Sequence, residues 1–400
     1  MKKCIVIGGG AAGIFAAIIC KQTPHLQVSV LEKSNQFLSK VKISGGGRCN
    51  VTHGLFDPRK LIEYYPRGSK ELLGAFFRFQ PKDMIAWLEE KGVHLKTEKD
   101  GRVFPVTDSS MTIVECLLNA AKKAGVELLP RKNVLSITPK GNSFEIQVEG
   151  QELLHCDFVV LATGGSTYGH ALAKTLGHHI TETAPSLFTF NVPGSPLKEL
   201  SGISVQDAEI TLPECSLKQR GALLITHFGF SGPAILKLSA FAARHLKRCD
   251  YKTTIKINWA PDLTIADLYR LKKEKPLKTL ASENPTRIPQ QLWKTLVPDH
   301  GKVLGHLSDA SLQHVLFSLQ NSLYELNGKT THKEEFVTCG GIDLKEVDCT
   351  AFQSKLLPHL FFAGEVLDID GVTGGFNFQN AWTTSYLAAT KISSLIADKK

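Results

Sequence analysis

The first residues with a chemical pattern are three glycines and an acid near the N-terminus. Gly8, Gly10 and Gly13 follow the apolar run 4–7, and Glu32 lies 19 residues beyond Gly13. Glycines at these positions permit a tight turn, let the backbone approach a pyrophosphate and let a helix pack closely on a strand. A carboxylate at this separation accepts hydrogen bonds from an adenosine ribose. The pattern predicts a dinucleotide site, and a glycine-rich turn without a ligand is the alternative.

Two strands and a helix must position these residues. An apolar strand enters the turn, small residues from Ala11 and Ala12 onward predict a helix, and a second apolar strand ends at Glu32 and Lys33. Ala11, Ala12 and Lys33 are expected to contact the dinucleotide together with the glycines and Glu32. The N-terminus of the helix would offer free N–H groups to phosphate oxygens. Strand, helix, second strand and acid together make a βαβ unit, so we expect the chain to begin with a Rossmann-like domain.

A second glycine-rich edge lies near the other end of the chain. Residues 360–363 predict a buried strand, and a glycine turn then opens the last helix. The positive N-terminus of that helix would stabilise an anionic ligand. We therefore expect both ends of the chain to share one ligand; the alternative is a tight turn that caps a core helix. The expected contacts of this edge are Gly364, Glu365, Asp370, Gly374, Gly375 and Asn377.

The segment 44–52, with the sequence SGGGRCNVT, is predicted to be a loop that approaches the same ligand. Glycines let the backbone come close, and arginine and asparagine supply hydrogen-bond donors. Cys49 is also a candidate general acid, since a thiol beside Arg48 in an exposed loop would have a lowered pKa. A structural thiol is the alternative. The expected ligand contacts are Lys42, Ser44, Gly45, Gly46, Arg48, Cys49 and Asn50.

Two further turns carry polar residues. Thr163, Gly164 and Gly165 follow an apolar strand, and their glycines would let the backbone pass close to the ligand, so all three are expected contacts. A later glycine loop holds His227 and Ser231, which are candidates to face a substrate; a hairpin with a satisfied histidine is the alternative. The sequence contains no Ser/His/Asp triad spacing, zinc signature or Walker motif, which argues against phosphoryl transfer and metal-dependent hydrolysis.

The charge of the chain is strongly positive. It has 400 residues, a formal net charge of +9 and a pI of about 9.0. Between Lys40 and Lys82, nine Lys or Arg stand against Asp57, Glu63 and Glu71, a local charge of +6. Such an excess suits a polyanion, and a solvated basic surface with a few phosphate contacts is the alternative.

The cysteines and the apolar segments indicate a cellular compartment. Nine cysteines are scattered without a CxxC pair, which indicates reduced thiols in a cytosol rather than a disulfide framework. No window holds enough uninterrupted apolar residues to span a bilayer. We expect a soluble cytoplasmic protein without a membrane partner, and the oligomeric state is open.

Composition divides the chain into four segments. Alternating strands and helices predict the first part of the dinucleotide-binding domain over residues 1–187 and its second part over 329–400. Short strands separated by Pro and Gly predict a β-rich substrate domain over 188–260, and residues 261–328 predict a helical subdomain. Residues 36–56 are predicted to be a loop. The expected fold class is α/β.

Several segments together resemble the BaiN/RdsA-type family of NAD(P)/FAD-dependent oxidoreductases, which includes the YhiN-like flavoproteins. They are GGGAAG, ISGGGRCNVT, ATGG, THFGFSGPA, VTCGGI and LFFAGEVLDIDGVTGGFNFQNAW, and they span nearly the whole chain. His53 is a small departure, since many relatives carry Asn. The resemblance implies an FAD-binding domain of the glutathione-reductase type, split by a β-barrel-like module and a helical subdomain. It also implies non-covalent FAD and NAD(P)H as a transient electron donor.

The resemblance further implies reduction of an activated C=C bond by hydride from NAD(P)H through the flavin. The leading substrate is a uridine of large-subunit ribosomal RNA, reduced to dihydrouridine, and the basic charge favours a polyanion over a steroid. Alternatives are reduction of a bile-acid-like small molecule, oxidation of a small amine such as aminoacetone, and an RNA-binding protein that holds FAD without turnover.

Overall fold

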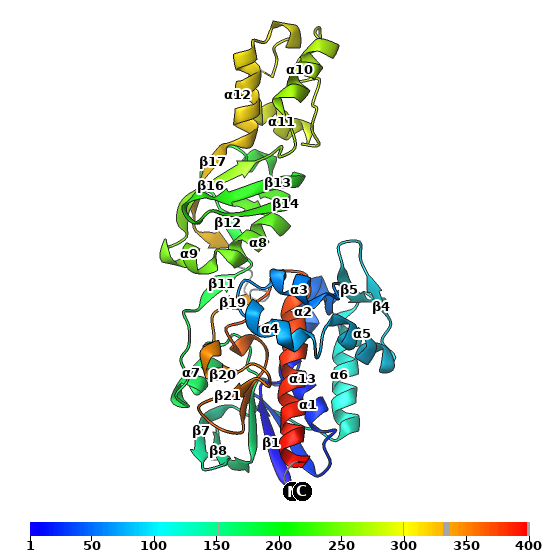
Figure 1. Cartoon of the computed structure of the whole chain (residues 1–400), viewed down its shortest axis with the longest axis vertical. Helices are drawn as coiled ribbons and strands as arrows, with labels where there is room; N and C mark the ends of the chain where they lie inside the picture. Colours follow the sequence, from blue (N-terminus) through cyan, green and yellow to red (C-terminus); the bar gives the residue numbers. More distant parts are fainter. Residues whose placement is uncertain (151, 299, 331–336, 398–400) are drawn as a thin grey trace. The chain divides into compact units, whose positions relative to one another are not determined.

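The computed structural model describes residues 1–150, 152–298, 300–330 and 337–397. They form two compact units, the first made of Met1–Ala184 and Lys333–Lys400 and the second of Pro185–His332. Both ends of the chain therefore belong to the first unit. Figure 1 shows its first helix, α1, beside its last helix, α13.

A parallel sheet forms the centre of the first unit. β1 (Lys2–Ile7) lies between β2 (Leu26–Glu32) and β10 (Phe158–Leu161), and β6 (Glu127–Pro130) and β22 (Leu360–Phe362) extend the sheet on the two sides. All four pairings are parallel. β10 is buried over its whole length, which explains its continuous apolar sequence. Because parallel strands end at the same edge, the polar residues that follow β1, β2, β10 and β22 come together there.

Three helices of the first unit pack side by side: α1 (Ala11–Cys20), α6 (Ser110–Ala124) and α13 (Phe376–Ala397) (Figure 1). Because α1 contacts both of the others, nearly all of its residues are buried, and its sequence is accordingly small and apolar. α6 has a buried stripe and ends at Gly125, whose left-handed φ of 79° closes the helix. The apolar periodicity of residues 112–124 and the glycine that follows them predict such a helix from the sequence alone.

Smaller elements complete the first unit around this core. Its other helices are α2 (Ser39–Gly47), α3 (Pro58–Leu61), α4 (Ser69–Phe76), α5 (Pro81–Glu90) and α7 (Thr167–Thr175). Two three-stranded antiparallel sheets consist of β3 (Thr52–His53), β4 (Leu95–Thr97) and β5 (Arg102–Pro105), and of β7 (Val134–Lys140), β8 (Ser143–Val148) and β9 (Glu152–Cys156). β21 (Gln353–Ser354) and β20 (Val347–Asp348) continue the central sheet beyond β22 with antiparallel pairings. The remaining strand is β19 (Val337–Cys339), while β11 (Ala184–Ser186) lies at the unit boundary.

The predicted loop over residues 36–56 is wrong in its first half, because α2 occupies part of it. The backbone is helical from Ser39 to Ile43 and then breaks, with a ψ of 149° at Ser44 and φ values of 58° and 66° at Gly45 and Gly46. The glycines end the helix after little more than one turn, which is too short to leave a helical pattern in the sequence.

A closed antiparallel sheet forms the core of the second unit. Its strand order is β17-β16-β13-β14-β15-β12-β18. The two edge strands are consecutive in the chain and separated by Gly328, so one extended segment pairs with both sides and closes the sheet into a barrel. The strands are β12 (Thr189–Asn191), β13 (Ser204–Leu212), β14 (Leu217–Thr226), β15 (Gly229–Ser231), β16 (Lys252–Asn258), β17 (Ser322–Asn327) and β18 (Lys329–Thr330).

Helices of the second unit lie partly where strands were expected. α8 (Pro233–Phe241) and α9 (Ala243–Arg248) interrupt the β-rich segment, and β17 lies inside the segment predicted to be helical. α8 covers buried strands of the barrel with its own apolar side chains, so its composition resembles that of the neighbouring strands. α10 (Ile265–Glu274), α11 (Gln290–Leu296) and α12 (Asp309–Gln320) follow as expected. None of the described helices has the length and apolar character needed to cross a membrane.

The glycine turn after β1 generates a test of the fold. A Cβ on Gly13 would lie 1.9 Å from the carbonyl oxygen of Gly8, whereas a Cβ on Gly10 would find no atom within 4 Å. Gly13→Ala is expected to lower the free energy of unfolding by about 1–3 kcal/mol, since backbone must move. Gly10→Ala is expected to change it by less than about 0.5 kcal/mol. Denaturant unfolding of both variants is the measurement, and equal losses would contradict this packing.

Candidate dinucleotide-binding site

A cleft of about 480 Å³ lies at the carboxyl edge of the parallel sheet in the first unit. Ligands of doubly wound α/β folds bind at this edge. Residues from both ends of the chain meet in it. They are Gly8, Gly9, Gly10, Ala11, Ala12, Glu32, Ser39, Lys40, Val41, Ile43, Ser44, Gly45, Ala162, Thr163, Gly164, Val337, Gly364, Glu365, Thr373, Asn377, Phe378 and Ala381.

The three fingerprint glycines have different surroundings. Gly8 has a φ of 108°, and a Cβ there would lie 2.4 Å from the carbonyl oxygen of Ala162 at the end of β10. Gly13 is packed against Gly8, as described above. Gly10 instead borders open space in the cleft and precedes the first residue of α1. The open approach to Gly10 and the N-terminus of α1 together suit an anionic phosphate group.

The carboxylate of Glu32 is fixed beside this turn. Its Oε2 accepts a hydrogen bond from the Gly9 N–H at 2.7 Å, and its Oε1 accepts one from the Ser34 N–H at 2.8 Å. The side chain lines the cleft. Because each carboxylate oxygen has a further lone pair, Glu32 can still accept hydroxyl groups of a ligand.

The C-terminal segment closes the opposite wall of the cleft. The Gly364 N–H donates to Thr384 Oγ1 at 2.8 Å, and the Ser385 hydroxyl donates to the Ala12 carbonyl at 2.8 Å. Glu365 lines the cleft, with Oε1 accepting from the Thr338 N–H at 2.8 Å and Oε2 lying 3.2 Å from Lys40 Nζ. The hydrogen bond from Ser385 of α13 to Ala12 of α1 thus holds the two ends of the chain at one site.

Asp370, which was predicted to contact the ligand, pairs with another residue of the first unit. Its carboxylate is fully buried and forms two hydrogen bonds with the guanidinium of Arg67, whose side chain is 11% exposed. Neither residue lines the cleft. The ion pair anchors the segment before α13, because a buried charge requires a partner.

The glycine pair before α13 also shapes the backbone rather than the cleft wall. A Cβ on Gly375 would lie 2.4 Å from the Thr52 carbonyl oxygen, and one on Gly374 would lie 2.9 Å from the ring of Phe376. Asn377 does line the cleft, and its side-chain amide exchanges two 2.8 Å hydrogen bonds with the backbone of Gly371.

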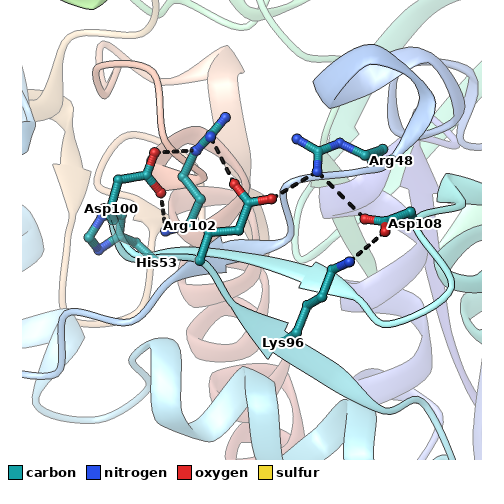
Figure 2. A network of polar contacts seen from close by, with 7 residues as sticks. Arg48, His53, Lys96, Asp100, Arg102 and Asp108 are labelled. Atoms are coloured by element: carbon teal, nitrogen blue, oxygen red, sulfur yellow. Dashed lines mark hydrogen bonds and ion pairs between the residues drawn. The ribbon is translucent and has the colours of Figure 1, made fainter. Parts of the chain in front are cut away.

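Arg48 does not line the cleft, and its side chain joins a polar network at the β4–β5 hairpin (Figure 2), so its predicted contact with the ligand stays a prediction. Its Nη1 lies 2.8 Å from Glu98 Oε1 and 3.5 Å from Asp108 Oδ1. The guanidinium also lies over the Phe104 ring, 4.1 Å from its centroid. The hydrogen bond to Glu98 raises the pKa of Arg48, and a hydrogen bond from Lys96 lowers the pKa of Asp108.

This hairpin holds the glycine segment from outside the cleft. The Val51 N–H donates to the Val103 carbonyl at 2.9 Å, and the Gly54 N–H donates to the Gly101 carbonyl at 2.7 Å. Within the hairpin, Arg102 bridges Glu98 and Asp100 with hydrogen bonds of 2.8 Å each (Figure 2). Arg48 is therefore a residue that positions the loop.

The prediction that Cys49 is exposed and that its thiol has a lowered pKa is wrong. The side chain is fully buried, and burial raises the pKa of the thiol to about 12, although a hydrogen bond with Ser44 partly opposes this shift. The residue adopts a φ of 59°, and its N–H donates to the Ser44 carbonyl at 3.0 Å. The neighbouring positive charge has no acidifying effect because the Arg48 side chain lies at the hairpin.

Thr163 is the strongest polar candidate in the middle of the cleft. It lines the cleft, and its hydroxyl is buried without a hydrogen-bond partner among the residues that the structure describes. Gly164 lines the cleft beside it, whereas a Cβ on Gly165 would lie 2.6 Å from the Thr338 side chain. A buried hydroxyl that lacks a partner is costly, so it indicates a ligand or water at this position.

The cleft contains part of the predicted set. The predicted residues that line it are Gly8, Gly10, Ala11, Ala12, Glu32, Ser44, Gly45, Thr163, Gly164, Gly364, Glu365 and Asn377. The others, Gly13, Lys33, Lys42, Gly46, Arg48, Cys49, Asn50, Gly165, Asp370, Gly374 and Gly375, lie outside the lining. Ser39, Lys40, Val41 and Ile43 were not predicted, and a helix assignment for α2 would have found them. The other lining residues that were not predicted are Gly9, Ala162, Val337, Thr373, Phe378 and Ala381.

His227 and Ser231 belong to the second unit. His227 is exposed in the turn between β14 and β15, and Ser231 pairs with Leu224 at the end of β15. The turn is closed by Thr226, whose hydroxyl accepts from the Gly229 N–H at 3.1 Å. A role of His227 and Ser231 toward a substrate stays a prediction.

Comparisons with known proteins identify relatives over the full length. A family described as "HI0933-like protein Rossmann domain" matches residues 2–391. The chain is 28% identical to the ribosomal RNA dihydrouridine synthase of Escherichia coli K12, over 99% of this chain and 98% of that protein. It is 25% identical to the 3-dehydro-bile acid delta(4,6)-reductase of Clostridium scindens, over 97% of this chain and 98% of that protein.

A solved structure shows the same fold. The 3-ketosteroid delta1-dehydrogenase from Sterolibacterium denitrificans has a TM-score of 0.54 at 12% identity, covering 99% of this chain and 100% of that chain. Together with the parallel sheet, the matches confirm the predicted α/β, Rossmann-like fold class.

Thiol labelling tests the environment of Cys49. Because the thiolate is the reactive species, a thiol with a raised pKa stays neutral and unreactive near pH 8. Native protein treated with iodoacetamide is expected to react at the half-buried Cys215 and Cys249 before Cys49, as measured by peptide mass spectrometry. Unfolded protein, in which all thiols react, is the control. Early modification of Cys49 would disprove the buried environment.

Hydrogen exchange tests the role of the hairpin. Glu98→Gln removes the charge that holds Arg48, so amides of residues 44–50 are expected to exchange several-fold faster. The matched control is Glu145→Gln, which breaks the Lys140–Glu145 ion pair on another hairpin of the same unit. If both variants exchange like the original protein in residues 44–50, Arg48 does not position the loop.

Proposed function

The chain belongs to the HI0933-like Rossmann family, and from this premise we propose that it is an FAD-dependent oxidoreductase. The observation that carries the proposal is the cleft, in which a glycine turn and a helix N-terminus from one end of the chain face a second helix N-terminus from the other end. The expected resemblance to the BaiN/RdsA-type family agrees with the named relatives.

The residues of the cleft fit FAD. Gly10 and the N-terminus of α1 would hold the pyrophosphate, and Glu32 would accept hydroxyl groups of the adenosine ribose. Thr163 would donate its unpartnered hydroxyl, and the N-terminus of α13 at Asn377 would face the flavin end. Bound FAD would supply hydride transfer, with NAD(P)H as the donor.

The substrate proposed is a uridine of large-subunit ribosomal RNA, whose C=C bond is reduced to give dihydrouridine. Two relatives carry the name ribosomal RNA dihydrouridine synthase, from Escherichia coli and Haemophilus influenzae, each 28% identical over at least 97% of this chain. The net charge of +9 suits an RNA substrate. The base must leave its stack to reach the cleft. Such a protein acts in the cytoplasm, where ribosomal RNA lies.

A second candidate is a small-molecule ene-reductase. The specific observation in its favour is the bile-acid reductase of Clostridium scindens, which matches 97% of this chain at 25% identity. Steady reduction of a free bile-acid-like enone by the purified protein, without RNA, would favour it over the first candidate.

Dihydrouridine mapping tests the RNA substrate. Large-subunit ribosomal RNA from a strain that lacks the gene is expected to lose dihydrouridine at one or a few positions, and re-expression of the protein is expected to restore it. Re-expression of the Gly10→Val variant is the matched control for dependence on the cleft. If the deletion leaves the dihydrouridine content of ribosomal RNA unchanged, ribosomal RNA is not the substrate.

The Gly10→Val variant also tests the cofactor. The backbone at Gly10 has a φ of −81° and an extended ψ, which a β-branched residue can also adopt. A Cβ at this position would have no atom within 4 Å, so the fold is expected to persist. The side chain would then occupy the proposed pyrophosphate position, and the purified variant is expected to be colourless. Gly74→Val, at another glycine with open surroundings, is the control that should stay yellow. A yellow Gly10→Val protein with full FAD content would overturn the assignment.

A further inference from the structure

Three aromatic rings from three segments of the first unit lie in a nearly parallel stack. They are His53 of β3, Tyr64 of the short 3₁₀ helix Ile62–Tyr64, and Phe376, the first residue of α13. The ring centroid of Phe376 lies 4.8 Å from that of His53 and 4.5 Å from that of Tyr64, with interplanar angles of 21° and 10°. We call His53, Tyr64 and Phe376 the aromatic stack.

Hydrogen bonds of the backbone hold two of these rings in place. The Val372 N–H donates to the Tyr64 carbonyl at 2.9 Å, and the Tyr65 hydroxyl donates to the Phe376 carbonyl at 2.7 Å. The segment around Tyr64 is thus fixed to the segment that begins α13. Because the rings are held before a ligand arrives, a ligand that stacks on them would lose little of its affinity to ordering them.

The backbone also packs against the edges of the rings. A Cβ on Gly101 would lie 2.3 Å from the His53 ring, and one on Gly374 would lie 2.9 Å from the Phe376 ring. His53 Nε2 lies 3.1 Å from the Asp100 carbonyl oxygen, at the tip of the β4–β5 hairpin (Figure 2). These contacts at the ring edges keep the ring planes aligned.

The aromatic stack lies beside the proposed FAD cleft. Thr373 and Asn377, which flank Phe376 in the sequence, both line the cleft, and Thr373 is exposed, so the cleft reaches the surface there. Phe376 itself is 1% exposed, whereas His53 and Tyr64 are half-buried. Solvent therefore reaches the stack at His53 and Tyr64, next to the place where the cleft opens.

The parallel rings favour a flat ligand. Unpaired bases of RNA stack on aromatic side chains through their planar faces, and this contact requires no net charge. A bile-acid-like steroid consists of puckered, largely saturated rings, so it cannot lie flat on an aromatic ring. Dihydrouridine has two saturated ring carbons and is puckered as well. Among the ligands of the two candidate functions, uridine is therefore the one whose shape matches the stack.

We propose that the aromatic stack binds the flat face of the substrate pyrimidine where the cleft opens, and that it favours uridine over steroids and over the reduced product. Reduction removes the planarity of the ring, so the contact weakens and the product leaves more readily. This assignment rests on the proposed function, because it names the feature of uridine that the protein recognises.

A pair of RNAs with equal charge tests the proposal. One is a short single-stranded oligomer of uridine labelled with fluorescein, and the other is the same oligomer with dihydrouridine in place of uridine. Their affinities for the FAD-loaded protein are measured by anisotropy. The original protein is expected to bind the uridine oligomer roughly 5-fold or more tightly than the dihydrouridine oligomer, as for the loss of one stacked base.

Variants of Tyr64 assign this preference to the stack. Tyr64→Leu keeps an apolar side chain but removes the ring, and it is expected to bind both RNAs with equal, weak affinity. Tyr64→Phe keeps the ring and is expected to retain the preference. The matched control is Tyr269→Leu, which removes a tyrosine that is 37% exposed on α10 and should leave the preference unchanged. The FAD content and unfolding midpoint of each variant show whether it is folded and loaded.

Each outcome supports or overturns the proposal. Equal binding of the two RNAs by the original protein, or no binding of either, would overturn it. A Tyr64→Leu variant that keeps the preference would do the same, and so would one that loses FAD while Tyr269→Leu keeps it, because the stack would then serve the flavin.

The proposed function is judged by a separate measurement. If dihydrouridine in ribosomal RNA depends on the gene but the protein shows no preference for uridine, the aromatic stack is overturned and the function stands. If dihydrouridine does not depend on the gene, the function fails, and a preference for uridine that still requires the Tyr64 ring would support the stack as a pyrimidine-binding surface.

Discussion

The close approach of three backbone segments at the first glycine turn is the constraint on which the rest of the structure depends. Gly8 lies against the carbonyl of Ala162, and Gly13 lies against the carbonyl of Gly8. Any side chain at these points would separate β1 from β10 or from α1. With this packing in place, the N-terminus of α1 lies at the carboxyl edge of the sheet, and Gly10 leaves space in the cleft wall. The same turn therefore serves both stability and binding.

A second set of contacts brings the end of the chain to this turn. Thr52 donates to Gln379 at 2.7 Å, and the Trp382 indole N–H donates to the Val51 carbonyl at 3.0 Å, so α13 is fixed to the segment after the glycine loop. These hydrogen bonds are buried, which makes each costly to lose. α13 also packs along α1, so the two ends of the chain form one domain, and the second unit is inserted between them in the sequence. The cleft of this domain is lined by residues from both ends of the chain.

Charged residues around the cleft divide into two groups by their partners. Arg48, which the sequence predicts to contact the ligand, is held by carboxylates, and so is Arg67. Arg59 and Lys60, which belong to the basic stretch between Lys40 and Lys82, are exposed and have no such partners among the described residues. A count of basic residues therefore indicates the sign of a partner's charge, and the pairing of each side chain decides which residues can contact it.

The sequence by itself determined the elements whose patterns are local. The βαβ unit ending at Glu32, the helix α6 with its stop at Gly125 and the family motifs could be predicted because spacing and periodicity carry the information. Tertiary structure alone decided the burial of Cys49, the direction of Arg48 and the pairing of Asp370 with Arg67, residues 303 positions apart. A glycine-rich loop has no preferred side-chain direction of its own, so contacts with distant segments determine where its side chains point.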